Sequence, residues 1–118
     1  MSYVDGFLVP VPKSKKAAYR KMARLGVEIF TDHGATRVVE CWGDEIPESK
    51  VTGFDRAVKL KEDEVVVFSW IEWPDKRARN QGTKKAMSDP RWESIDPKNL
   101  PFDGKRMMYG GYRVLVSS

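Results

Sequence analysis

The sequence contains one cysteine, Cys41, and one histidine, His33, among 118 residues. A lone cysteine excludes an intrachain disulfide and is typical of proteins from reducing compartments. Long apolar runs are also missing: residues 65–71 form the longest, whereas a membrane span needs about 20 apolar residues. Residues 1–5 lack the basic and apolar segments of a signal peptide. We therefore expect a cytoplasmic protein with no membrane partner.

Motifs for metals, nucleotides and other cofactors are missing as well. One histidine and one cysteine cannot complete a usual four-ligand zinc site without carboxylates. The acidic residues Asp44, Glu45 and Glu48 lack the spacing and the glycine of a calcium loop. Gly110 and Gly111 precede no predicted helix, so they do not form a phosphate-binding loop. We expect neither a metal nor a cofactor.

A Cys–His nucleophile pair is disfavoured by the predicted positions of Cys41 and His33. A helix is expected to end at His33, and Cys41 falls within the following strand, so the two side chains should lie far apart. We expect His33 to bind the last carbonyls of its helix and Cys41 to be a small buried apolar residue.

The composition is that of one soluble globular domain covering residues 1–118, with 41% apolar and 32% charged residues. The net charge of +4 is unevenly placed: residues 13–24 and 76–85 are basic and contain no acid, whereas residues 44–64 are rich in acids. Such basic segments can bind phosphates, but they more often form solvated helix faces.

Hydrophobic periodicity predicts strands and helices in the order βαββαβ. This order predicts an α+β, ferredoxin-like fold, in which two helices cover one face of an antiparallel four-stranded sheet. The expected strands span residues 3–11, 35–42, 64–73 and 105–117. Helices are expected from Ser14 to Asp32 and from Asp75 to Met87, with a short helical turn after Thr52.

The strands carry apolar residues on both faces, most clearly at residues 65–68. A sheet with one face in water would alternate between apolar and polar side chains. Two sheets packed face to face explain the pattern economically, so we expect a homodimer of the dimeric α/β-barrel type.

Five stretches of the sequence are distinctive: YVDGF at 3–7, VECWGDEIP at 39–47, VVFSWIEWPDK at 66–76, MSDPR at 87–91 and PFDGKRMMYGGY at 101–112. In these stretches the chain resembles the YbaA-like family of small bacterial proteins of unknown function, in the dimeric α/β-barrel superfamily. The resemblance implies a ferredoxin-like protomer whose open sheet face packs on a partner, and it implies no established activity.

Three carboxylates lie in apolar parts of predicted strands: Glu40, Asp5 and Glu72. A carboxylate facing an enclosed space would have a raised pKa and could transfer protons, and Glu40 is the strongest candidate for a catalytic residue. The alternatives are a cross-strand ion pair with Arg37, Arg106 or Arg113, or a side chain that simply points outward at a sheet edge.

Aromatic residues on the strands are candidates for a ligand pocket or for the dimer core, notably Phe7, Trp42, Trp70 and Tyr109. Together with Asp5 and Glu72, these four residues form our predicted pocket set. Stacking on RNA is disfavoured, because residues 64–73 lack the glycine and basic residues of an RNA-recognition strand.

We expect the protein to bind a small, largely apolar organic molecule in or beside the barrel, and the residues leave open whether it acts as a cofactor-free enzyme. A non-catalytic interaction module is the main alternative. RNA binding through the basic helices is a weaker alternative, and we do not expect nucleic acid as a partner.

Overall fold

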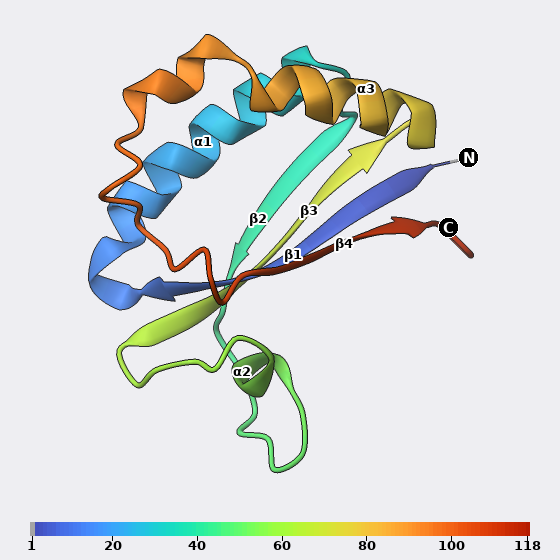
Figure 1. The fold of residues 1–118 in the computed structure, drawn as a ribbon. Helices are drawn as coiled ribbons and strands as arrows, with labels where there is room; N and C mark the ends of the chain where they lie inside the picture. Colours follow the sequence, from blue (N-terminus) through green and yellow to red (C-terminus); the bar gives the residue numbers. More distant parts are fainter. Residues whose placement is uncertain (1) are drawn as a thin grey trace.

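A computed structural model describes residues 2–118 as a four-stranded sheet with the two long helices on one side (Figure 1). The predicted order is confirmed, and the short helix after Thr52 is present. The elements are β1 (Tyr3–Pro12), η1 (Lys13–Lys15), α1 (Lys16–Asp32), β2 (Arg37–Trp42), α2 (Phe54–Ala57), β3 (Glu64–Trp73), α3 (Lys76–Met87), η2 (Pro90–Ser94) and β4 (Met108–Arg113).

The strands pair in the order β2-β3-β1-β4, and all three pairings are antiparallel. This is the ferredoxin-like arrangement expected from the sequence. The predicted bounds of β3 are correct, but β4 is shorter than residues 105–117. Arg106 explains the late start of β4, because its side chain binds Glu64 and Asp103 and holds this part of the chain in a loop.

The helix ends follow local signals in the sequence. Asp75 caps α3 by accepting a hydrogen bond from the backbone N–H of Ala78 at 2.7 Å. Gly34 follows α1 with a φ of 106°, a conformation that glycine adopts without strain. Within residues 2–118, no helix combines the length and the apolar composition that crossing a bilayer requires.

Odd-numbered residues of β1 and β3 point toward the helices and build the core. They are buried because each strand alternates its side chains between the two faces of the sheet. The buried members are Tyr3, Val9 and Val11 of β1 and Val67, Ile71 and Trp73 of β3.

The even-numbered side chains of β1 and β3 point to the other face, which has no helix layer (Figure 1). Residues 43–63 lie against one end of this face, where the rings of Phe54 and Phe68 are in edge contact at 5.9 Å. Pro10 and Val66, at the same end, are fully buried. At this end the chain covers part of its own open sheet face.

Gly111 allows a close approach between β4 and the core. A Cβ at this position would lie 2.9 Å from Nη2 of Arg79 and nearer still to the hydroxyl of Tyr3. The pairing of β1 with β4 continues from Asp5 and Gly111 directly to Gly6 and Gly110, with no extra residue on either strand. The two adjacent glycines therefore mark a close approach of the backbone and not a β-bulge.

Candidate functional site

A cavity of about 520 Å³ lies between the helix-facing side of the sheet, α1 and the segment that follows α3. Most of the residues that line it are apolar, and the sheet, α1 and the segment after α3 all contribute to the lining. Representative lining residues are Val38 of β2, Met22 and Phe30 of α1, and Trp92, Phe102 and Met107 of the segment. The cavity therefore has the size and the apolar character of a small-molecule site.

The sequence builds the roof of this cavity from one stripe of α1. Tyr19, Met22, Ala23, Gly26 and Phe30 recur at the spacing of a single helix face, and all five line the cavity. Gly26 keeps this face shallow, because a Cβ there would already touch the ring of Trp92 at 3.5 Å.

The polar side chains of the cavity are Tyr19, Glu40 and Ser69. The Tyr19 hydroxyl donates a 2.7 Å hydrogen bond to Oε1 of Glu40. Glu40 is exposed on the edge strand β2, but its carboxyl group is partly desolvated beside α1. This desolvation raises the pKa of Glu40, and the hydrogen bond from Tyr19 offsets part of the increase. Burial and the adjacent Glu40 also raise the pKa of Tyr19, so its hydroxyl remains a donor at neutral pH. The pair therefore couples a carboxyl group of raised pKa to a phenol.

A second, smaller cleft of about 330 Å³ lies beside the cavity and shares Tyr19, Ala23 and Glu40 with it. Trp42 forms one wall of this cleft, and Nζ of Lys16 lies 5.1 Å from the centre of its ring. Of the predicted site residues, Glu40 and Trp42 line the smaller cleft, and Glu40, Phe7 and Trp70 line the cavity.

Asp5 lies apart from both spaces, in a partly buried ion pair with Arg79. It accepts hydrogen bonds from Nε1 of Trp73 at 3.0 Å and from Nη2 of Arg79 at 2.8 Å. Asp5 therefore pairs with an arginine, which was one of the alternatives for the three carboxylates. The arginine lies on α3, however, and was not one of the three candidates.

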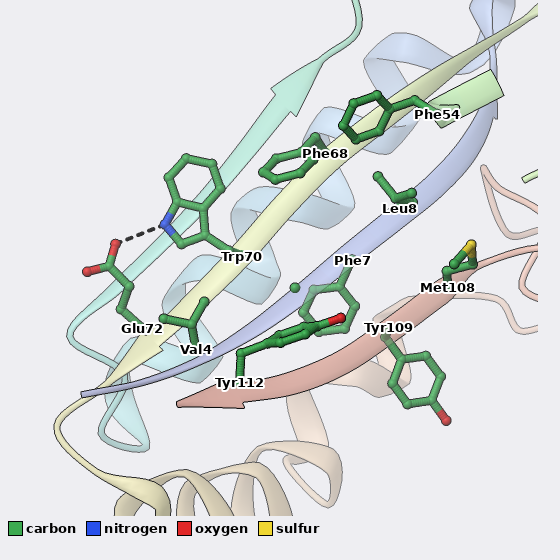
Figure 2. Close-up of a pocket in the computed structure, with 11 residues that line it drawn as sticks. Val4, Phe7, Leu8, Phe54, Phe68, Trp70, Glu72, Met108, Tyr109 and Tyr112 are labelled. Carbon is green, nitrogen blue, oxygen red and sulfur yellow. Dashed lines mark hydrogen bonds between the residues drawn. The ribbon is translucent and has the colours of Figure 1, made fainter. Parts of the chain in front are cut away.

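Trp70 and Glu72 lie on the open face of the sheet, where Figure 2 shows them lining a groove of about 640 Å³. The indole N–H of Trp70 donates to Oε2 of Glu72 at 2.9 Å, and Nη1 of Arg37 lies 4.0 Å from the same oxygen. The ring of Tyr109, on β4, is stacked 6.3 Å from that of Phe7 and is mostly exposed. The predicted pocket set is thus divided between the two faces of the sheet and the core.

Cys41 and His33 correct two predictions from the sequence. Cys41 is exposed and not buried, because β2 is an edge strand with a neighbour on one side only. The His33 ring does not bind the last carbonyls of α1: its Nε2 lies 2.9 Å from Oδ2 of Asp89, while its backbone N–H serves the carbonyls of Ile29 and Phe30. Within residues 2–118, no three potential metal ligands converge.

Sequence reasoning missed the polar partner of Tyr19. This residue belongs to the apolar stripe of α1, and nothing in the spacing pairs its hydroxyl with Glu40. The basic residues Lys16, Arg20 and Arg24 are exposed, as expected for a solvated helix face, and they also line the smaller cleft.

Comparisons with known proteins give a family and a fold. The family described as "Protein of unknown function (DUF1428)" matches residues 2–104. The uncharacterized protein YbaA of Escherichia coli K12 is 52% identical over 116 residues, which is 98% of each chain, and the Shigella flexneri protein of the same description matches equally well.

Two solved structures share the fold at low sequence identity. An uncharacterized NIPSNAP domain protein from Burkholderia xenovorans superposes with a TM-score of 0.58 at 18% identity, covering 95% of this chain and 93% of that one. A NIPSNAP family protein of unknown function from Agrobacterium tumefaciens gives 0.56 at 18% identity, covering 94% and 86%. By its sequence, the chain belongs to the DUF1428 family of proteins of unknown function.

Proposed function

We propose that this protein binds a small, largely apolar organic molecule in the cavity between the sheet and α1. The observation that carries the proposal is an apolar space of about 520 Å³ with one hydrogen-bonded polar pair, Tyr19 and Glu40, in its lining. Ligand sites commonly have this make-up, in which apolar walls supply affinity and a few polar groups fix orientation. A cytoplasmic location fits the single cysteine, which is unpaired.

The same pair supports a cofactor-free reaction by proton transfer. The raised pKa brings Glu40 nearer to neutral pH, where a carboxylate is a more effective general base. In this reaction Glu40 takes a proton from the bound molecule, and the Tyr19 hydroxyl holds the carboxyl group in place. Without a turnover step, the same cavity serves as a binding site only.

The proposal is tested by thermal-shift screening of a metabolite library, because a ligand of the native state raises the melting temperature. Gly26→Leu places a side chain in the cavity, and Ala18→Leu adds the same side chain to an exposed position of α1. We expect hits to stabilise the wild type and Ala18→Leu but not Gly26→Leu. A screen without hits would favour an interaction module, and hits that stabilise Gly26→Leu equally would place the ligand elsewhere.

A homodimer through the open sheet face is the second part of the proposal. Several apolar side chains of this face remain partly exposed around the groove in Figure 2: Leu8, Phe68, Trp70, Met108 and Tyr112. Contiguous apolar patches of this kind are unusual on soluble monomers and commonly mark interfaces. Packing against a second copy would bury the groove and complete an α/β barrel.

Light scattering at micromolar concentration tests the dimer. Phe68→Lys is the informative variant, because Phe68 is 46% exposed and lies on the open face. A lysine at the neighbouring Val67 would instead disrupt the core, into which that side chain points. We expect a wild-type dimer and a folded monomeric variant. The control is Lys50→Glu, which changes an exposed residue of a loop and should leave the dimer intact. A wild-type monomer would refute this part of the proposal without affecting the ligand site.

A further inference from the structure

We propose that the ligand of the cavity is an organic anion, with its apolar body in the cavity and its negative group in the adjoining cleft, where Lys16, Arg20 and Arg24 bind it. This inference rests on the proposed ligand site and specifies the chemical class of the ligand. It is carried by the placement of three cations beside an apolar cavity.

The three basic residues lie on one side of α1, because their spacing of four residues brings each one turn above the last. All three line the cleft of about 330 Å³. Within the described chain, none of them lies within ion-pair distance of a carboxylate, a property that they share with Arg56, Arg77 and Arg113 but not with Arg37, Arg79, Arg91 and Arg106. Like charges at this spacing repel one another, and a bound anion would relieve this repulsion.

The cleft and the cavity adjoin each other. Tyr19, Ala23 and Glu40 line both spaces, which places the cations of the cleft beside the apolar interior of the cavity. Arginine suits the charged end, because its planar guanidinium group donates paired hydrogen bonds to carboxylates and phosphates. The face of Trp42, under the Lys16 ammonium group, offers an apolar wall next to the charges.

Glu40 is the acidic residue that lines the cleft, and it opposes an anion only when ionised. Partial desolvation raises its pKa, which weakens this opposition. Glu28 lies one turn beyond Arg24, beside the neighbouring surface of α1, and it does not line the cleft. The local balance is therefore three cations against one carboxyl group.

A matched ligand series tests the inference. Decanoate, decanol and decylamine share an apolar chain and differ in charge, and each is titrated against the neutral fluorescent probe N-phenyl-1-naphthylamine bound to the protein. We expect decanoate to displace the probe at about tenfold lower concentration than decanol, and decylamine to be the weakest. Added salt should weaken decanoate and leave decanol unchanged.

Two triple variants separate the cleft from the general charge of the protein. Replacing Lys16, Arg20 and Arg24 by glutamine should bring decanoate to the affinity of decanol and leave decanol unchanged. Replacing Arg77, Lys84 and Lys85 by glutamine removes the same charge from α3 and should leave both affinities unchanged.

The outcomes distinguish this inference from the proposed function. Equal affinity of the wild type for decanoate and decanol would overturn the anion site but keep the cavity as a ligand site. An equal loss of decanoate binding in both triple variants would also overturn it, since the net charge alone would then explain the preference. If neither the probe nor any of the three compounds binds, the apolar cavity is not a ligand site and the proposed function fails.

Discussion

The same substitution, glycine to alanine, should have opposite effects at two helix positions of this protein. Gly26 lies inside α1 and Gly82 inside α3, and in an open helix either change would stabilise by about 1 kcal/mol. At Gly26 the new Cβ would meet Cη2 of Trp92 at 3.5 Å, which is an ordinary contact. Gly26→Ala is therefore expected to raise the free energy of unfolding by up to about 1 kcal/mol.

At Gly82 the space is already occupied. A Cβ would lie 2.7 Å from Cη2 of Trp73 and closer still to the carbonyl oxygen of His33. Trp73 is only 1% exposed, so its ring has no free volume into which it can move. Overpacking costs about 1–3 kcal/mol, and two rigid obstacles favour the upper end. After the helix gain of about 1 kcal/mol is subtracted, Gly82→Ala should lose about 2 kcal/mol.

Thermal and urea unfolding at one fixed protein concentration measure both effects, since the melting temperature of an oligomer depends on concentration. For a domain of this size, about 4 °C per kcal/mol is expected, so Gly82→Ala should melt about 8 °C below the wild type and Gly26→Ala up to about 4 °C above it. A Gly82→Ala protein as stable as the wild type would refute the reasoning, because α3 could not then pack so closely on Trp73.

Three further predictions concern the charged groups. Arg79→Met removes the cation from the Asp5 carboxylate and should lower the free energy of unfolding by about 1–3 kcal/mol in urea titrations, because the pair is only partly buried; an unchanged stability would contradict a contribution from the pair. The pKa of Glu40 is raised in the folded state, so ionisation of Glu40 destabilises the native state as pH rises above about 4.5. The free energy of unfolding of Glu40→Gln should therefore increase relative to the wild type from pH 4 to pH 7. A difference that does not grow with pH would refute this prediction. The hydrogen bonds from Arg106 lower the pKa of Glu64 in the folded state, so this pair stabilises the protein above the ordinary pKa of glutamate and the contribution is lost as pH falls through the folded-state pKa. In Arg106→Gln the free energy of unfolding should fall less steeply on acidification than in the wild type. An unchanged dependence at acidic pH would argue against the pair.

Local patterns in the sequence were sufficient for the elements and for their order. The apolar run of β3, the stripe along α1 and the Asp75 cap depend on neighbours within a few residues, so they could be recognised without tertiary structure. The same patterns placed Glu40 beside a candidate pocket and predicted that the second face of the sheet would be apolar.

Tertiary contacts decided the rest, because they join residues far apart in the chain. Tyr19 meets Glu40 across 21 positions and Arg79 meets Asp5 across 74, and neither pairing follows from spacing alone. The exposure of Cys41 follows from the place of β2 at the sheet edge, and burial of Val66 follows from residues 43–63 folding over one end of the open face. Alternation along a strand identifies two faces, but only the packing of distant segments determines which face is covered and what covers it.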